Sequence, residues 1–463
     1  MTVRERQRLR ASTLARAGAV IAPAYDRSAT PCIAHMGLGA FARAHLAVYA
    51  DDLLRRGQPA LIRGVSIRSH RTQDQLEPQD GLFTVAIREP GEDMSLQVVG
   101  ALTSVETGPD AALDALTAPA TKLVTLTITE KGYEATANLP ASDVPTSVPV
   151  LVALSLAQRR QAGVAPPVFA SLDNLLDNGS MLRARVLEAA ERIDPSLAPW
   201  IARDVLFPSS VVDRMVPAPT ERDLEEVADR LGLIDRAAVS AERHRSWIIR
   251  SVDGLASLAD VGVELVQDVA PFERRKLWLL NGPHSATAYG GLLAGHETIA
   301  GAVTDPVIAA FVRRLVDDTL EVAELPAGLQ AVAFAGEALR RFANPALGHT
   351  CAQVGADGSS KLPQRLLPVV AARKALALDT EGFAVVVAIW IAATAGLAVR
   401  GVHLPQLEDP IAGALRAAAR REGLQGLSHA ALGSLADGAF AAEVASALQR
   451  LTADGPAILE AER

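Results

Sequence analysis

The stretch PCIAHMGLGAFARAHLAVYADDLL, residues 31–54, decides the fold of the first part of the chain. Its apolar run over 31–36 stops at Gly37 and predicts a short buried strand. The residues that follow repeat apolar side chains at helical spacing from Phe41 to Leu53, which predicts a helix. A strand, a glycine turn and a helix in direct succession are the beginning of an α/β unit.

Residues 37–42 of this stretch read Gly-Leu-Gly-Ala-Phe-Ala, a G-x-G-x-x-A pattern. Gly37 permits a tight turn, Gly39 lets a pyrophosphate approach the backbone, and Ala42 is small enough for close packing of helix on strand. With Phe41, these residues are the cofactor-binding candidates, and the phosphates are expected at the positive helix N-terminus. The alternative is a purely structural turn, but the position between strand and helix favours a dinucleotide loop.

The run LIRGVSI, residues 61–67, predicts a second strand, which is followed by Arg68 and Arg71. An acidic residue at this point would bind the ribose 2′-hydroxyl of NAD, whereas basic residues accommodate the 2′-phosphate of NADP. The two arginines could also be solvated loop charges. The choice between NAD and NADP is therefore open at this position. We expect NAD without excluding NADP, and include Arg68 among the cofactor-binding candidates.

Three more apolar runs, 82–87, 122–128 and 167–172, predict further strands between helical segments. Strands that alternate with helices indicate a parallel α/β sheet. We therefore predict a Rossmann-type NAD(P)-binding domain over residues 1–265. Hardly any strand-like run follows, which predicts a mostly α-helical substrate and catalytic domain over residues 266–463.

Aspartate–proline pairs mark two expected helix starts in this second domain. Asp305-Pro306 and Asp409-Pro410 each combine an N-cap residue with a first-turn proline. The first helix should end before Pro326, and the second should end near Gly423.

The composition bounds the possible functions. The chain has 463 residues, of which 49% are hydrophobic and 21% charged, as in globular proteins of two or three domains. A net charge of −8 argues against nucleic-acid binding. Two cysteines cannot form a disulfide framework and fit a reducing cytoplasm, and the first twelve residues contain no apolar signal core. The apolar segment 382–399 reaches the lower length limit of a membrane span, but a buried helix is the better interpretation.

The stretch KLWLLNGPHSATAYGG, residues 276–291, contains the main candidate catalytic residues. A dehydrogenase without a metal must remove a hydroxyl proton as hydride leaves carbon, and must stabilise the alkoxide. Lys276 with Asn281 and His284 offers an amine base, an amide donor and an imidazole. On a helix, Lys276 and His284 lie roughly on one face, although Pro283 interrupts the hydrogen-bond ladder between backbone groups. The alternative is an ordinary amphipathic helix with a solvated lysine.

Taken together, the motifs resemble those of the mannitol dehydrogenase family, the polyol-specific long-chain dehydrogenases and reductases. The matching segments occur in the family's order over most of the chain, with Val212-Asp213-Arg214 as the most distinctive. They are GLGAFARAHLAVY (37–49), TLTITEKGY (125–133), SLDNLLDNG (171–179), FPSSVVDRMVP (207–217), KLWLLNGPHS (276–285) and DGSSKLPQR (357–365).

The resemblance implies a role for each matching residue. Lys276 corresponds to the general base, and Asn174 and Asn281 correspond to the asparagines that hold the reacting oxygen. His284 corresponds to an imidazole that contacts substrate. Two further substrate-pocket positions fall on Asp213 and Lys361, and an acid linked to the proton path of the lysine falls on Glu273.

The resemblance also implies a zinc-independent activity that interconverts a secondary alcohol and a ketone of an open-chain polyol or sugar acid. The segments LPQRLLP, GVSIRS and PQDGLF look most like fructuronate reductases, also called D-mannonate oxidoreductases. Gly348, Thr350 and Ala352 depart from that subgroup. Mannitol 2-dehydrogenase and D-arabinitol 4-dehydrogenase are therefore the alternatives, and we expect a monomer or a weak oligomer.

Less specific interpretations remain open for several of these residues. Glu273 and Lys276 could form a surface ion pair, and Asp213 and Arg214 a structural one. Asn174 could cap a following helix. A non-catalytic nucleotide or sugar sensor could keep the fold, but it would not need Lys276 with both asparagines. A metal-dependent alcohol dehydrogenase would need a His/Cys/carboxylate cluster, and no spacing in the sequence supplies one.

Overall fold

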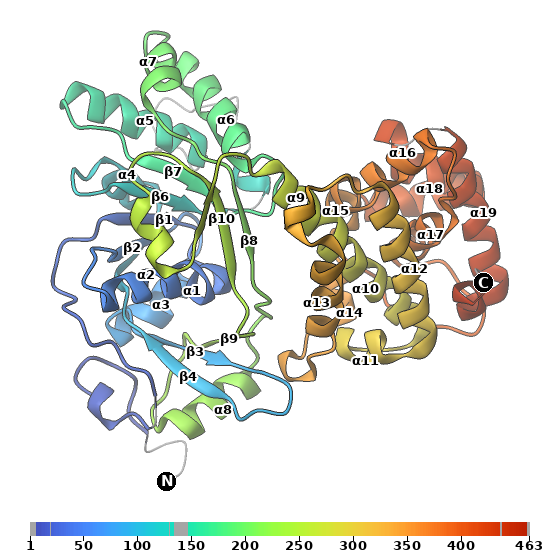
Figure 1. Cartoon of the computed structure of the whole chain (residues 1–463), viewed down its shortest axis with the longest axis horizontal. Helices are drawn as coiled ribbons and strands as arrows, with labels where there is room; N and C mark the ends of the chain where they lie inside the picture. Colours follow the sequence, from blue (N-terminus) through green and yellow to red (C-terminus); the bar gives the residue numbers. More distant parts are fainter. Residues whose placement is uncertain (1–5, 19, 129, 134–146, 436–437, 461–463) are drawn as a thin grey trace. The chain divides into compact units, whose positions relative to one another are not determined.

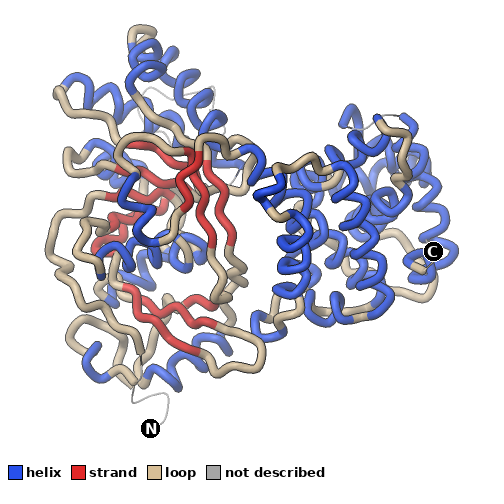
Figure 2. The backbone as a smooth tube through the Cα atoms, viewed as in Figure 1, coloured by secondary structure: helices blue, strands red, loops and turns tan. Residues whose placement is uncertain are grey.

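The computed structural model describes residues 6–18, 20–128, 130–133, 147–435 and 438–460. The chain divides into two compact units, Met1–Val269 and Ala270–Arg463. Figure 1 follows the chain through both units, and Figure 2 shows the strands confined to the first of them. The predicted fold class is confirmed, because a parallel sheet with helices is followed by a helical unit. The first five residues, which belong to the segment searched for a signal core, lie outside the described ranges.

The core of unit 1 is a five-stranded sheet in the order β5-β2-β1-β6-β7. All four pairings in this sheet are parallel. Its strands are β1 (Ile33–Met36), β2 (Ile62–Ser66), β5 (Leu102–Thr107), β6 (Leu123–Leu126) and β7 (Val168–Ser171). The predictions of strands at 31–36, 61–67, 122–128 and 167–172 are therefore correct. β5 was not predicted.

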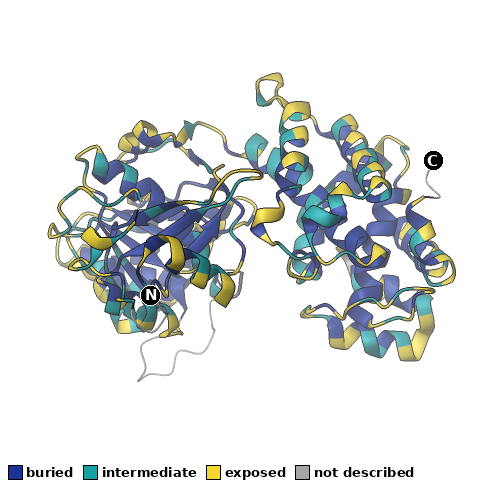
Figure 3. Cartoon of the chain, turned by 90° about the horizontal axis from the view of Figure 1, so that it is seen from below, coloured by how far each residue is buried: buried dark blue, intermediate teal, exposed yellow. Residues whose placement is uncertain are grey.

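Both faces of this sheet are covered, which explains why β1, β6 and β7 are mostly apolar along their length. Successive residues of one strand enter different cores: Ile33 packs in the core that includes α1 (Ala40–Ala44) and α2 (Leu46–Arg55). Its neighbour Ala34 packs in the core that includes the helices α4 to α7. Figure 3 shows the sheet as a mostly buried layer. Those helices are α4 (Pro109–Thr117), α5 (Val148–Gln161), α6 (Asn178–Ile193) and α7 (Leu197–Asp204).

The strand predicted at 82–87 exists as β3 (Phe83–Ile87), but it does not belong to the parallel sheet. β3 pairs antiparallel with β4 (Ser95–Val99) and parallel with β9 (Val239–Ala241) in a separate three-stranded sheet. The prediction of one parallel sheet was incomplete, because a local apolar pattern does not determine which strand becomes the partner. A third sheet joins β8 (Ser210–Asp213), β10 (Ser246–Arg250) and β11 (Glu264–Val266).

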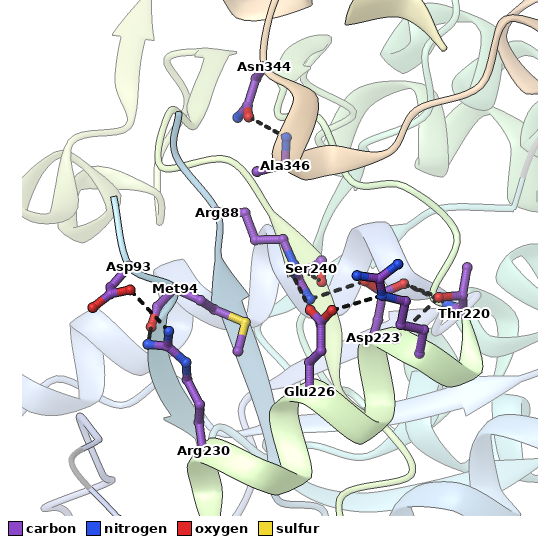
Figure 4. Close-up of polar contacts among 11 residues, drawn as sticks. Arg88, Asp93, Met94, Thr220, Asp223, Glu226, Arg230, Ser240, Asn344 and Ala346 are labelled. Carbon is purple, nitrogen blue, oxygen red and sulfur yellow. Dashed lines mark hydrogen bonds and ion pairs between the residues drawn. The ribbon is translucent and has the colours of Figure 1, made fainter. Parts of the chain in front are cut away.

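A polar cluster attaches α8 (Glu221–Leu231) to the sheet that contains β3. Arg88 donates to Ser240 at 3.0 Å, and forms ion pairs with Asp223 at 3.1 Å and Glu226 at 2.9 Å (Figure 4). Asp223 also completes a capping box with Thr220 at the start of the helix. One arginine thus links the end of β3, β9 and the first turns of α8. The short helix α3 (Arg71–Leu76) completes the helices of unit 1.

Unit 2 is built from helices. They are α9 (Ala270–Lys276), a π-helical segment (Leu277–Asn281), α10 (Gly282–Ala294), α11 (Ile299–Thr304), α12 (Pro306–Val322), α13 (Ala331–Phe342), α14 (Cys351–Gly355), α15 (Gly358–Arg365), α16 (Leu367–Ala375), α17 (Glu381–Ala395), α18 (Ala412–Leu432) and α19 (Gly438–Asp454).

One of the two predicted helix starts in this unit is confirmed. Asp305 caps α12 by accepting from the backbone N–H groups of Val307 and Ile308, and this helix ends before Pro326. The second was wrong, since α18 begins at Ala412 rather than at Pro410. The carboxylate of Asp409 accepts from the backbone N–H of Ile411, directly before the helix, and also from Ser359 N and Trp390 Nε1. Gly423 does break the helix, with φ 63° and ψ −155°, but a further helical stretch follows it directly.

The apolar segment 382–399 forms most of α17, whose residues from Gly382 to Ala395 are buried within unit 2. Tertiary packing, rather than lipid, covers its apolar faces. Within the described ranges, no helix combines the length and apolar character needed to span a bilayer.

Candidate functional site

The glycine loop between β1 and α1 has the geometry that its sequence predicts. Gly37 adopts φ +93°, and a Cβ at this position would lie 2.1 Å from the carbonyl oxygen of Thr127, so the tight turn requires glycine. Gly39 differs, because its φ is −92° and a Cβ would meet no protein atom closer than 4.0 Å. The space beside Gly39 is therefore open, as the approach of a pyrophosphate would require.

Buried polar groups hold this loop in place. The carbonyl oxygen of Gly37 accepts from Thr127 Oγ1 at 2.6 Å, and His35 Nε2 lies 3.3 Å from the same oxygen. His35 Nδ1 lies 2.9 Å from Thr125 Oγ1. Burial lowers the pKa of His35 to about 4, so the imidazole is neutral at neutral pH. The loop thus rests on a network of fixed side chains from β1 and the end of β6.

The remaining cofactor candidates lie around this loop. Ala42 is buried in α1, and the half-buried ring of Phe41 stacks on His45 with centroids 4.9 Å apart. Arg68 is exposed two residues beyond the end of β2, and β2 is the strand that neighbours β1 in the sheet. Open space at Gly39 and a helix start at Ala40 fit a dinucleotide, and an exposed guanidinium fits its polar ribose or phosphate groups.

Residues Val212, Asp213 and Arg214, at the end of β8, connect this strand with α1 and with the segment after β9. Arg214 is buried and donates to the carbonyl oxygen of Ala44, at the end of α1. It also donates to the carbonyl oxygen of Glu242 at 2.8 and 2.9 Å. Asp213, itself buried, lies 3.5 Å from His244 Nε2. Arg214 therefore anchors the glycine-loop helix, a role that local sequence spacing did not indicate.

Asn174 is exposed in the loop after β7. It does not cap the next helix, because α6 begins at Asn178 and its N-cap residue is Asp177. The preceding Asp173 accepts from Tyr133 Oη at 2.7 Å and from Ile128 N at 3.2 Å. The segments TLTITEKGY and SLDNLLDNG, which are far apart in sequence, therefore meet directly before Asn174.

In unit 2, a π-helical segment separates Lys276 from His284. The Gly282 N–H bonds to the carbonyl of Leu277, five residues back, instead of the usual four. Lys276 directly precedes this segment and Asn281 is its last residue, so the wider turn changes the angle between these two positions around the helix axis. In a regular α-helix these two positions would point in different directions. Pro283 does not end the helix, since α10 runs through it to Ala294.

Burial differs among these residues. Glu273 and Asn281 are both buried, whereas Lys276 is half-buried. A surface ion pair is therefore a poor description of Glu273. Lys361 is half-buried on α15, and its Nζ donates to the carbonyl oxygens of Val354 at 3.2 Å and Ala356 at 2.5 Å.

The half-buried imidazole of His284 contacts two other rings. It stacks on Phe342 with centroids 4.5 Å apart and lies 5.5 Å from His349. Nε2 is shielded from water and has no hydrogen-bond partner among the described residues. Burial, followed by the charges of His349, Arg365, Lys361 and Arg341, holds the pKa of His284 well below its usual range. The ring is therefore neutral and has a polar atom for which a hydroxyl group would be a suitable partner.

The structure thus assigns the predicted site residues to two groups. Unit 1 contains the glycine loop, Arg68, Asn174 and Asp213, and unit 2 contains Glu273, Lys276, Asn281, His284 and Lys361. Sequence reasoning missed Arg341 and Arg365, whose position near His284 depends on the packing of α13 and α15. It also missed the π-helical segment, for which the sequence offered only Pro283 as a sign.

In comparisons with known proteins, two domain models of one family match successive parts of the chain. Residues 31–258 match the model of the mannitol dehydrogenase Rossmann domain, and residues 268–452 match that of the mannitol dehydrogenase C-terminal domain. The chain belongs to the mannitol dehydrogenase family, and is thus a polyol or sugar-acid dehydrogenase.

The similar individual proteins include a D-mannonate oxidoreductase and mannitol 2-dehydrogenases. D-mannonate oxidoreductase of Escherichia coli (strain K12) is 36% identical over 420 residues, covering 85% of this chain and 86% of that protein. Mannitol 2-dehydrogenase of Cereibacter sphaeroides is 34% identical, covering 94% of this chain and 97% of its own. The structure of the Pseudomonas fluorescens mannitol 2-dehydrogenase ternary complex with NAD and D-mannitol has a TM-score of 0.90 at 29% identity, and covers 98% and 99% of the two chains.

Proposed function

We propose that this protein transfers hydride between NAD(H) and a secondary alcohol of an open-chain sugar acid, with D-mannonate and D-fructuronate as the preferred pair. The observation that carries the proposal is the 36% identity to D-mannonate oxidoreductase over 85% of the chain. NAD is supported by the NAD complex of the mannitol 2-dehydrogenase relative and by the open space beside Gly39. Residues 1–265 would bind the dinucleotide, and residues 266–463 would supply the substrate and catalytic groups.

In this proposal each site residue has a defined task. NAD⁺, held at the glycine loop by Gly37, Gly39 and the start of α1, would supply the hydride acceptor. Neutral Lys276 accepts the hydroxyl proton in the oxidation, and its ammonium returns a proton to the alkoxide in the reduction. The amides of Asn174 and Asn281 donate hydrogen bonds to the reacting oxygen, an arrangement whose loss costs on the order of a hundredfold in rate or more.

Other residues bind the rest of the substrate. His284 would orient a neighbouring hydroxyl through its shielded Nε2. Asp213 and Lys361 would bind further substrate oxygens. Glu273, buried on the turn before Lys276, would connect the lysine with the path by which its proton leaves. We further infer a reducing compartment such as the cytoplasm, because Cys32 and Cys351 are both free.

The second candidate is oxidation of a neutral polyol, as in mannitol 2-dehydrogenase or D-arabinitol 4-dehydrogenase. The TM-score of 0.90 to the mannitol 2-dehydrogenase complex favours it. Both candidates share the proton-transfer groups and differ in the substrate.

A spectrophotometric screen separates the two. The absorbance of the reduced nicotinamide is followed with D-mannonate, D-altronate, D-mannitol and D-arabinitol, each with NAD⁺ and with NADP⁺. We expect the largest kcat/KM with D-mannonate and NAD⁺. A preference for D-mannitol or D-arabinitol would establish the second candidate, and no turnover of any of the four would contradict the proposed function.

A further inference from the structure

Cationic side chains gather around His284 in unit 2. Arg341 is buried at the end of α13, and Lys361 and Arg365 are half-buried on α15. Arg365 Nη1 donates to Ser285 Oγ at 3.0 Å, and Ser285 directly follows His284 on α10. Two helices, α13 and α15, thus bring positive charge to a histidine on a third helix, α10.

Burial and these charges lower the pKa of the His284 imidazole. After burial, the pKa of His284 is lowered by His349, Arg365, Lys361 and Arg341, of which the last three are cations, whereas burial lowers the pKa of His349 itself. Five residues further along α10, burial raises the pKa of Tyr289, Arg365 lowers it, and Asp409 and Asp357 raise it. Asp409 is engaged there by Ser359 N at 2.9 Å and Trp390 Nε1 at 3.1 Å.

A polar ligand atom is also expected at this position. His284 Nε2 is shielded from water without a hydrogen-bond partner in the described part of the chain, and so is Nδ1 of the neighbouring His349. Shielded polar atoms cost free energy unless a ligand or an ordered water satisfies them. A hydroxylated ligand would satisfy these nitrogens, and positive charge nearby would attract an anionic one.

We propose that Arg365, together with Lys361 and Arg341, forms an anion subsite beside His284 that binds the carboxylate of a sugar-acid substrate. The inference rests on the proposed function and deepens it, because it makes the substrate an aldonate or a ketouronate rather than a neutral polyol. Arg365 is the main determinant, since a planar guanidinium can hold a carboxylate through two parallel hydrogen bonds. Lys361 is held by the carbonyl oxygens of Val354 and Ala356 and contributes a positive charge.

The test compares acid and neutral substrates of the same carbon number. In the wild type, kcat/KM is measured for D-fructuronate and D-fructose with NADH, and for D-mannonate and D-mannitol with NAD⁺. Arg365→Gln removes the charge, and Arg365→Lys keeps the charge but loses the fork of donors. Arg340→Gln is the matched control, because Arg340 is a neighbouring exposed arginine that pairs with Glu337 on the surface.

We expect a wild-type preference for the acids of at least a hundredfold. Arg365→Gln should lower the ratio of acid to neutral kcat/KM at least tenfold, mainly through a higher KM for the acid. For Arg365→Lys the ratio of acid to neutral kcat/KM should lie between those of the wild type and Arg365→Gln. For Arg340→Gln it should match the wild type. Equal losses with both substrates, identical behaviour of Arg365→Lys and Arg365→Gln, or a wild-type preference for the neutral substrates would overturn the subsite.

Direct binding separates this inference from the proposed function. D-mannonate and D-mannitol are titrated calorimetrically into the wild type and both Arg365 variants in the presence of NAD⁺, and thermal melting confirms that each variant is folded. Binding of D-mannonate that depends on Arg365, without turnover, would support the subsite and contradict the dehydrogenase function. A wild type that does not bind D-mannonate would overturn the subsite, whereas turnover of polyols alone would leave the dehydrogenase class intact.

Discussion

Lys276 lies where α9 ends and the π-helical segment begins, five residues before Asn281. The Gly282 N–H bonds to the carbonyl of Leu277 there, so the backbone between the two residues departs from a regular α-helix. In the proposed role of Lys276 as the base, a fixed amide for the reacting oxygen matters, because a misplaced oxygen loses the stabilisation of the alkoxide.

Lys276→Ala should reduce kcat at neutral pH by at least about a hundredfold, since proton transfer by a positioned side chain contributes that much or more. Binding of NADH should stay close to that of the wild type, because the candidate dinucleotide loop lies in unit 1. Stopped-flow turnover and NADH fluorescence titration measure the two quantities. Lys122→Ala, at an exposed lysine of unit 1, is the control. A variant that retained wild-type turnover would refute the role of Lys276 as the base.

His35 gives a prediction about stability against pH. Its folded-state pKa of about 4 lies below the ordinary value of 6.5. A depressed pKa favours the folded state above pH 6.5, and that stability is lost as the pH falls from 6.5 through 4, because only the unfolded chain takes up the proton. The loss is on the order of 3 kcal/mol.

The urea midpoint of unit 1, followed by limited proteolysis between pH 7 and about pH 4, tests this prediction. His35→Gln should flatten the dependence without abolishing it, because burial also lowers the pKa of His45, to about 3. His70→Gln, at an exposed histidine, should behave as the wild type. The same slope in His35→Gln as in the wild type would show that His35 does not contribute.

At the scale of the element, the glycine loop shows two different reasons for the same residue type. The turn itself requires Gly37, since a side chain there meets the Thr127 carbonyl. The turn does not require Gly39, whose surroundings are open. A sequence pattern treats the two glycines alike, whereas the backbone separates a folding constraint from a binding constraint.

Two alanine variants test this distinction. Gly37→Ala should destabilise unit 1 by more than about 2 kcal/mol, through strain at positive φ and the clash with Thr127. Gly39→Ala should melt as the wild type does, but bind NADH at least about tenfold more weakly, because its methyl group would occupy the space proposed for the pyrophosphate. Melting curves and NADH titrations measure both effects. Unchanged affinity in Gly39→Ala would move the dinucleotide away from this loop.

The strand elements show how far a local pattern reaches. The apolar runs at 31–36, 61–67, 122–128 and 167–172 predicted four strands of the parallel sheet, because strands buried on both faces are apolar throughout. The run at 82–87 had the same appearance, yet β3 joins another sheet. The Asp409-Pro410 pair resembled a helix start, but α18 begins two residues later, and Asp409 also binds the backbone of Ser359 and the indole of Trp390.

At the scale of the whole molecule, the candidate site residues are distributed over the two units. Unit 1 supplies a glycine loop on a parallel sheet, and unit 2 supplies the lysine and the imidazole on a helical framework. No group of three histidine, cysteine, aspartate or glutamate side chains in the described ranges could hold a metal ion.

The family resemblance implies a zinc-independent activity, so turnover should be unaffected by EDTA over hours of incubation, and added Zn²⁺ should not raise it. Activity with the best substrate of the screen, before and after chelation and gel filtration, measures this. A zinc-dependent alcohol dehydrogenase treated in parallel confirms that the chelator acts. Loss of turnover that Zn²⁺ restores would show that the chain depends on a metal after all.

The sequence by itself determined the fold class, the family, the glycine loop and the candidate residues from Lys276 to His284, because these depend on hydrophobic periodicity and on residues that are close in the chain. Only the tertiary structure decided the strand order β5-β2-β1-β6-β7, the π-helical segment and the gathering of Arg341, Lys361 and Arg365 around His284. The physical reason is that burial and charge depend on neighbours brought together by packing, and packing partners separated by tens of residues leave no periodic trace in the sequence.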